Sequence, residues 1–151
     1  MTTQRKSHRP HRMHGVSLIE LLTVLTIVAI LGSLAVGAYG RYSLRANRTE
    51  ATAALLRIQV AEEKFFLGNN TYTTDFTAAP PTGLGTQASA NTNTNRYTIT
   101  LAAGASGNIA TSFLATATAI NGQLNDDSNC QVFTINDRGD RTPADSTGCW
   151  K

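Results

Sequence analysis

Hydrophobic and polar positions follow different patterns along the chain. Residues 21–40 form an uninterrupted stretch of 20 uncharged, mostly apolar side chains. Over residues 41–68 the apolar side chains instead recur every three or four positions, as at Leu55 and Ile58, which is the spacing of one face of an amphipathic helix. Since no proline interrupts residues 16–67, the two patterns together predict one long helix over that range.

The second half of the chain has the alternation that is typical of a β-sheet. Three segments rich in Thr, Ile, Phe and Val, at 97–101, 112–120 and 131–135, are followed by a turn signal at 136–139. An antiparallel sheet packed on the amphipathic half of the helix buries both apolar faces, so the predicted fold class is α+β. The residues expected in the core are Leu55, Ile58, Phe65, Ile99, Leu101, Phe113, Ala115, Val132 and Ile135.

A long connection separates the helix from the sheet. Gly68 and Asn69 are a plausible C-cap for the helix, because both residue types tolerate the left-handed backbone that ends helices. The segment 69–96 then contains Pro80-Pro81 and a run of Thr, Asn and Ala. It is too long for a simple connection, which favours a functional or mobile loop.

The apolar stretch is long enough to cross a membrane, because 20 helical residues rise about 30 Å. Four basic residues and no acid lie in residues 1–15, which predicts a cytoplasmic N-terminus and a head on the other side. Glu20 is the only charge in residues 16–40; it costs roughly 2.5–3.5 kcal/mol inside a membrane and so needs a partner. Two simpler interpretations stay open, an uncleaved membrane anchor and a secretory signal cleaved after Ala38.

The remaining composition offers little reactive chemistry. All three histidines lie in the first 15 residues, and residues 16–151 carry nine basic and ten acidic side chains. This distribution excludes a histidine-based metal or acid–base site in the head, and it argues against a broadly basic nucleic-acid binder. No nucleophile elbow, P-loop or HExxH motif is present. We therefore expect no enzymatic activity, no metal and no cofactor.

The junction between the basic leader and the apolar stretch carries a recognisable motif. Residues 15–20 read Gly-Val-Ser-Leu-Ile-Glu, which resembles the class III signal of type IV pilins. In that family a prepilin peptidase cuts after the glycine and N-methylates the new first residue. The resemblance implies cleavage between Gly15 and Val16 and N-methylation of Val16. It also implies that Glu20 is a subunit-docking residue, pairing with the N-terminal amine of a neighbouring subunit or of the same one.

Two features depart from the usual pilin pattern. The first mature residue is Val16 where phenylalanine is usual, and Gly37 stands where proline is often found. Gly37 and Gly40 each cost about 1 kcal/mol relative to alanine within a helix. We therefore expect a helix weak point at these glycines, where the helix can unwind as subunits enter a filament.

Cys130 and Cys149 frame the C-terminal segment. In an extracytoplasmic head an even pair predicts a disulfide, which stabilises the fold by roughly 3 kcal/mol on the chain-entropy model. Free thiols and a two-thiolate metal site are the alternatives. The pilin resemblance agrees with the disulfide, since type IV pilins have a disulfide-bounded C-terminal D-region. The Gly-Cys-Trp ending at 148–150 is similar to minor pilins of the PilE type.

The resemblance divides the chain into five segments. Residues 1–15 are the cleaved leader, residues 16–40 the transmembrane and filament-core half of the helix, and residues 41–68 its amphipathic half. Residues 69–96 form the αβ-loop, and residues 97–151 form the antiparallel sheet with its D-region.

The implied function is that of a structural subunit of a type IV pilus, and specifically a PilE-like minor pilin. Such a subunit acts in pilus assembly and hence in twitching motility, adhesion and DNA uptake. The implied partners are major and minor pilins, the prepilin peptidase, the inner-membrane assembly machinery and the inner membrane itself. The implied location is the inner membrane of a Gram-negative bacterium, with a periplasmic head, before assembly and the cell-surface pilus afterwards.

Three other functions stay open at this stage: a major pilin, a type II secretion pseudopilin, and a single-pass anchored periplasmic binding module. The cysteines argue against the pseudopilin, whose major form usually has a calcium site and no disulfide. Arg138 and Arg141 are interleaved with acids, so we expect no direct binding of nucleic acid. Arg48 and Glu50 are expected either to be solvated on the helix surface or to contact another subunit.

Overall fold

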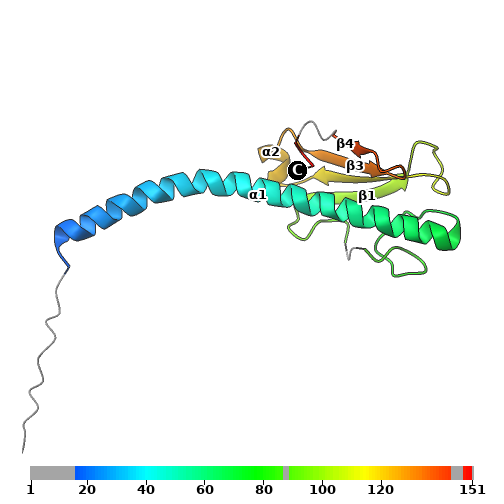
Figure 1. Cartoon of the computed structure of the whole chain (residues 1–151), viewed down its shortest axis with the longest axis horizontal. Helices are drawn as coiled ribbons and strands as arrows, with labels where there is room; N and C mark the ends of the chain where they lie inside the picture. Colours follow the sequence, from blue (N-terminus) through cyan, green and yellow to red (C-terminus); the bar gives the residue numbers. More distant parts are fainter. Residues whose placement is uncertain (1–15, 87–88, 144–147, 151) are drawn as a thin grey trace, which may run out of the picture. The chain divides into compact units, whose positions relative to one another are not determined.

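The computed structural model describes residues 16–86, 89–143 and 148–150 (Figure 1). The chain divides into two compact units, Met1–Tyr39 and Gly40–Lys151. One helix, α1 (Leu18–Asn69), contributes residues to both units. The leader, including Gly15, lies outside the described residues.

The first unit is a helix with apolar side chains on all sides. Every large apolar side chain for which exposure is described between Leu18 and Tyr39 is solvent-exposed within this chain, and the most apolar 18-residue window of α1 has a mean hydropathy of 2.4. The hydroxyl groups of Thr23, Thr26 and Ser33 donate to carbonyl oxygens three or four residues earlier in the same helix, so these groups are hydrogen-bonded without water. By length and composition this part of α1 can cross a membrane.

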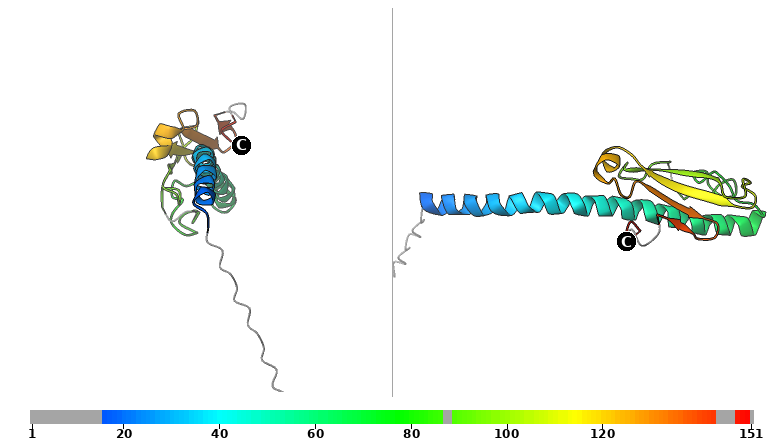
Figure 2. Two further views of the ribbon diagram at one scale, coloured as in Figure 1. Left: turned by 90° about the vertical axis from the view of Figure 1, so that its left-hand side faces the viewer. Right: turned by 90° about the horizontal axis from the view of Figure 1, so that it is seen from above.

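The second unit places a four-stranded antiparallel sheet along the later turns of α1 (Figure 2). The strand order follows the sequence, and each strand pairs with the next. The strands are β1 (Tyr97–Ala103), β2 (Phe113–Ala119), β3 (Val132–Asn136) and β4 (Arg141–Thr142), and a short helix, α2 (Gly122–Asp126), connects β2 to β3. The fold is therefore α+β, as the sequence predicted.

One hydrophobic core joins the sheet to the amphipathic half of α1. Alternate residues of each long strand face it, as the two-residue period of a strand requires. The register sets Ile99 opposite Ala117 and Leu101 opposite Ala115. The buried apolar residues are Ala51, Ala54, Leu55, Ile58, Phe76, Leu84, Tyr97, Ile99, Leu101, Phe113, Ala115, Ala117, Ala119, Cys130, Phe133, Ile135 and Cys149.

Two of the residues expected in the core lie elsewhere. Val132 is 45% exposed, and its neighbour Phe133 is fully buried instead. Val132 and Ile135 are three positions apart, so they cannot share a face of a regular strand, and the larger Phe133 takes the inner position. Phe65 is only partly buried and packs at the edge of the core.

The end of α1 also differs in detail from the expectation. The helix continues through Gly68 and Asn69, and Asn70 takes the left-handed conformation, with φ 53°. The backbone N–H of Asn70 donates to the carbonyl of Phe66 at 2.8 Å. Asparagine adopts this conformation more readily than other residues with a side chain, so it replaces the expected Gly68–Asn69 cap.

Candidate functional site

The Glu20 carboxylate has no partner within the described part of the chain. Glu20 lies in the first turn of α1 and is exposed, and the hydroxyl of Thr23 donates to its backbone carbonyl at 2.8 Å rather than to its carboxylate. The start of a helix favours a negative charge. In an apolar environment, however, a lone carboxylate is costly unless an opposite charge meets it. This residue therefore requires a partner from a neighbouring molecule or from the chain's own N-terminus.

Gly37 and Gly40 lie within α1 and are helical. A side-chain carbon added at either position meets no atom within 4 Å, so packing within this chain does not require a glycine there. The expected unwinding concerns assembled filaments, and it stays a prediction.

A polar network connects the middle of α1 to the C-terminal part of the head. Arg48 donates two hydrogen bonds to Asp127, from Nε to Oδ2 at 2.5 Å and from Nη2 to Oδ1. The Asp127 side chain is 2% exposed and that of Arg48 is 20% exposed. The hydrogen bond to Asp127 raises the pKa of Arg48, against the opposing effect of burial. This bidentate geometry is the strong form of an ion pair.

Gln123 of α2 extends this network to the sheet. Its Nε2 donates to Asp127 Oδ2 at 2.7 Å and to the hydroxyl of Tyr97 at 3.1 Å, and its Oε1 accepts from Asn47 Nδ2 at 3.0 Å. Tyr97 in turn donates to the backbone carbonyl of Cys130 at 2.9 Å, and burial raises the pKa of Tyr97 to about 12. The network therefore runs from α1 through α2 to the C-terminal disulfide.

Glu50 holds the end of the αβ-loop against α1. Its Oε1 accepts from the backbone N–H of Asn93 at 2.6 Å, and its Oε2 accepts from the hydroxyl of Thr94 at 2.5 Å. Arg48 and Glu50 thus both have partners within the head. They are therefore not freely solvated, and the subunit contact considered from the sequence stays a prediction.

The C-terminal segment is closed by the expected disulfide between Cys130 and Cys149, whose Cα atoms are 5.6 Å apart. Trp150 follows it and donates from Nε1 to the carbonyl of Thr142 in β4 at 3.1 Å. Its ring packs edge-on against Phe133, and the Arg141 guanidinium lies 5.2 Å from the ring centre. The disulfide and the indole together fix this segment to the sheet.

The start of the αβ-loop is organised by Asp75. Its Oδ1 accepts from the backbone N–H groups of Thr77 and Ala78 at 3.0 and 2.8 Å, and these hydrogen bonds, that of Ala78 first, lower the pKa of Asp75. A side-chain carbon at Gly83 would lie 2.6 Å from the Asp75 carbonyl oxygen. Only glycine therefore allows the two arms of this loop to approach so closely.

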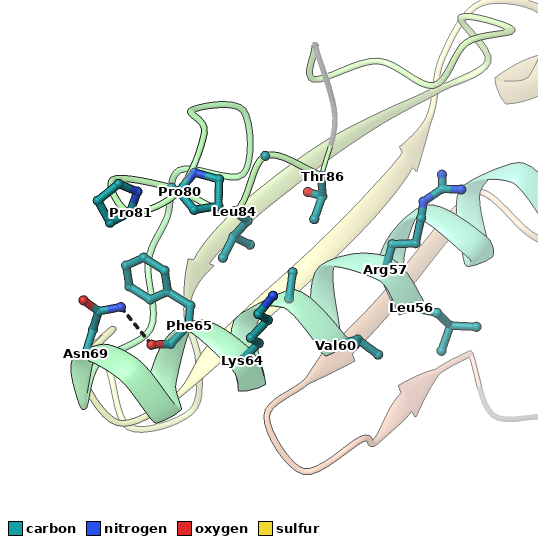
Figure 3. A pocket seen from close by; sticks show the side chains of 13 residues that line it. Leu56, Arg57, Val60, Lys64, Phe65, Asn69, Pro80, Pro81, Leu84 and Thr86 are labelled. Carbon is teal, nitrogen blue, oxygen red and sulfur yellow. Dashed lines mark hydrogen bonds between the residues drawn. The ribbon is translucent and has the colours of Figure 1, made fainter.

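A groove of about 840 Å³ lies between α1 and this loop (Figure 3). Phe65 and Asn69 lie at the end near the two prolines, Arg57 lies near Thr86, and Lys64 lies between them. Arg57 and Lys64 are exposed, and no acid is among the lining residues. The lining residues are Leu56, Arg57, Val60, Ala61, Lys64, Phe65, Asn69, Pro80, Pro81, Gly83, Leu84, Gly85 and Thr86. The groove is thus mainly apolar with two cationic side chains.

Glu62 is a fully buried acid on the core side of α1. Its Oε2 accepts from the backbone N–H of Thr73 at 3.2 Å, and its Oε1 has no hydrogen-bond partner among the described residues. Burial raises the pKa of Glu62 to about 7, partly opposed by the hydrogen bond from Thr73.

Comparison with known proteins identifies the family. The family described as "Type IV minor pilin ComP, DNA uptake sequence receptor" matches residues 37–134, which is more than half of the chain. The chain belongs to this family of type IV minor pilins. The prokaryotic N-terminal methylation motif matches residues 10–36. Together the two matches make the chain a pilus subunit of the kind that prepilin peptidase processes, and pilins of this family are structural proteins.

The fold of a type IV pilin is confirmed by comparison with solved structures. A type IV pilin from Shewanella oneidensis is similar, with a TM-score of 0.51 and 21% sequence identity. The likeness covers 72% of this chain and 98% of the Shewanella pilin. No curated protein matches the chain.

Sequence reasoning missed the interior polar residues of this pilin. Gln123 and Asp127 were assigned to a connection between strands, because a five-residue helix gives too little periodic signal. Glu62 was recognisable in principle, since it follows Leu55 and Ile58 on the apolar face at helical spacing. An acid at a core position is a signal in itself.

Proposed function

We propose that this chain is cleaved between Gly15 and Val16, N-methylated at Val16, and incorporated into a type IV pilus as a minor pilin. The observation that carries the proposal is the family match over residues 37–134, joined to a methylation motif over residues 10–36. The carboxylate of Glu20, which has no partner among the residues that the structure describes, supports it.

In this proposal the new α-amino group of one subunit pairs with Glu20 of a neighbour. Two opposite charges attract far more strongly in an apolar filament core than in water. Because either charge alone is costly there, the pair selects one register between adjacent helices. Glu20 therefore acts as the docking residue of assembly.

The proposed location follows from the same features. Before assembly the apolar half of α1 spans the inner membrane of a Gram-negative bacterium, with the basic leader in the cytoplasm and the head in the periplasm. The proposed partners are major and minor pilins, the prepilin peptidase and the inner-membrane assembly machinery. The subunit then supports pilus assembly and, through it, twitching motility, adhesion and DNA uptake.

Gly37 and Gly40 are the proposed weak point of α1 in the filament. Both leave open space around the helix, so their role is conformational rather than steric within this chain. Slow amide exchange at residues 37–40 in assembled filaments would contradict this role.

Intact mass tests the proposal. The protein is taken from membranes and from sheared surface filaments and weighed with and without reductant. The expected mass begins at N-methyl-Val16 and increases by two hydrogens on reduction. A mass beginning at Met1 indicates a plain membrane anchor, and one beginning at Tyr39 indicates a secreted domain. A dominant share of the sheared pilin indicates a major rather than a minor subunit.

A second candidate function is direct DNA binding, which the sequence alone did not favour. The matching family is described as a DNA uptake sequence receptor. The groove offers Arg57 and Lys64 about 10 Å apart along α1, with no acid among its lining residues. By contrast, Arg138 and Arg141 flank Asp140. We propose that the groove, rather than the β3–β4 turn, contacts DNA phosphates.

Fluorescence anisotropy with a labelled duplex tests this second function on the mature chain in detergent. Replacing Arg57 and Lys64 by Gln is expected to weaken binding about tenfold in low salt. The slope of the logarithm of the binding constant against the logarithm of the salt concentration is expected to become shallower by the contribution of about two phosphate contacts. Arg138→Gln with Arg141→Gln removes the same charge and is the matched control. If the control variant loses more DNA affinity than the groove variant, DNA binds at the β3–β4 turn instead. If the unmodified chain does not bind the duplex, direct DNA binding is refuted.

A further inference from the structure

Glu62 connects α1 to the first residues of the αβ-loop through a single hydrogen bond. The side chain is fully buried, and only the N–H of Thr73 reaches it, at 3.2 Å. Its Oε1 has no hydrogen-bond partner in the described structure. A neutral carboxyl tolerates this environment, whereas a carboxylate requires several donors or an opposite charge.

The groups that face Glu62 do not supply that charge. Glu63 is its neighbour on α1, Tyr72 faces it from the αβ-loop, and Asp137 approaches Tyr72 from the β3–β4 turn. All three are acidic or neutral. Within the described residues the one ion pair joins Arg48 to Asp127. Arg48 lies about four turns before Glu62 along α1. Ionised Glu62 therefore has no nearby cation to compensate it.

The cover over Glu62 is the turn that contains Tyr72 and Thr73. Tyr72 stacks on Phe66 with ring centres 4.6 Å apart and packs edge-on against Phe113 at 5.0 Å. If this turn moves away from the helix, water can reach the second carboxylate oxygen, and the Tyr72 side chain then loses its packing.

We propose that Glu62 is a pH-sensitive anchor for the start of the αβ-loop. The protonated side chain keeps the turn at Tyr72 and Thr73 closed over the helix. Loss of the proton opens the turn, because a buried carboxylate with one hydrogen bond gains more from hydration than the turn gains from packing. The raised pKa of Glu62, about 7, sets the change in the neutral range. The anchor is a property of the head and does not rest on the proposed function.

Opening of the turn also affects the groove. The carbonyl of Asp75 accepts the N–H of Leu84 at 2.9 Å, and Leu84 and Gly83 line the groove. Residues 73–75 thus support the loop wall that faces Arg57 and Lys64. Above neutral pH the wall is expected to lose this support, so any partner held by the groove is held less firmly.

Hydrogen exchange at residues 72–76 tests the anchor on the mature chain in detergent. After correction for intrinsic exchange rates, protection there is expected to fall about tenfold or more between pH 6 and pH 8.5. Glu62→Gln keeps the shape and removes the titration, so its protection is expected to be independent of pH. Asp126→Asn removes an exposed acid outside this turn; it is the matched control and is expected to behave like the unmodified chain.

An equal fall in Glu62→Gln, or no fall in the unmodified chain, overturns the proposal. If Glu62→Gln does not fold, carbon-13 NMR of the side-chain carboxyls gives the answer in the unmodified chain. The Glu62 carboxyl and the Thr73 amide are expected to titrate together near pH 7. Titration of Glu62 near its ordinary value of 4.5, or a Thr73 amide that does not follow it, refutes the anchor.

Discussion

Arg48 and Glu62 are charged residues of α1 that both face the interior of the head, and they differ in their partners. Arg48 meets a carboxylate that itself accepts from Gln123. Glu62 meets one backbone N–H and no cation. Buried charges are stable in proportion to the hydrogen bonds and opposite charges around them. Arg48 therefore supports the fold, whereas ionised Glu62 opposes it.

Removing Arg48 tests the first half of that contrast. Arg48→Gln leaves the carboxylate of Asp127 buried without its cation, so the free energy of unfolding of the head is expected to fall by about 3 kcal/mol. Urea denaturation followed by circular dichroism measures it. Arg45→Gln removes an exposed arginine one turn earlier and is expected to change stability by less than about 0.5 kcal/mol. Equal effects would show that the network carries little stability.

The raised pKa of Glu62 predicts a distinct pH dependence of stability. Its folded pKa, about 7, lies above the ordinary value of 4.5, so the unfolded chain loses the proton first as pH rises. Stability contributed by this group is therefore unaffected below pH 4.5, falls between pH 4.5 and 7, and stays low above it. The total loss is about 3 kcal/mol.

Comparison with Glu62→Gln isolates this loss from the titration of other groups. The difference in free energy of unfolding between the two proteins is expected to move in favour of the variant as pH rises from 4.5 to 8. Denaturation at several pH values measures it. A difference that does not vary with pH would mean that Glu62 is ionised throughout in the folded head.

At the scale of elements, α1 has one backbone conformation and two surfaces. Up to residue 39 it is apolar on all sides, and beyond residue 50 only one face is buried against the sheet. Hydrophobic side chains around the whole circumference require lipid or other helices, whereas an apolar stripe requires a single packed face. The head is held to this helix partly by its C-terminal disulfide segment, which shares the network of Tyr97.

Loss of the disulfide is expected to destabilise the head. The bond between Cys130 and Cys149 closes a segment with a sequence separation of 19 residues, so replacing both cysteines by Ser is expected to cost about 3 kcal/mol. Trp150 is the only tryptophan and packs on Phe133, so its fluorescence reports the unfolding of this segment. Reduction of the unmodified chain should reproduce the loss, and a difference between the two would point to a defect of the substitutions themselves.

At the scale of the whole molecule, folding and assembly use different parts of the chain. The head has its own hydrophobic core and begins at Gly40, while the apolar residues of the first unit are exposed. A subunit of this kind completes the burial of its first unit only in a membrane or a filament. Folding defects and assembly defects should therefore be separable.

Glu20→Gln tests that separation. The variant is expected to keep the stability of the head, because distant sites act independently. Its share of sheared filaments is expected to fall about tenfold or more, because the proposed partner amine is left without its counter-charge. Glu63→Gln removes an exposed acid from the head and is the matched control. Normal incorporation of Glu20→Gln would contradict the docking role.

Features that repeat along the chain were determined by the sequence itself. The long helix, the three main strands and the α+β class follow from periodicity, because hydrophobic burial imposes periods of 3.6 and 2 residues. The pilin family was likewise recognisable from residues 15–20, since a glycine, an apolar residue and an acid at fixed spacing precede an apolar stretch. These signals are local, so a single sequence contains them.

Tertiary structure alone decided which residues meet across the head. Arg48 pairs with Asp127, which is 79 residues away, and Gln123 pairs with Asn47, which is 76 residues away. No local pattern specifies such pairs. The choice of Phe133 over Val132 for the core, the groove under residues 80–86 and the isolation of Glu62 likewise depend on which surfaces come together. Burial changes the cost of a charge by several kcal/mol, and burial is settled only when the chain has folded.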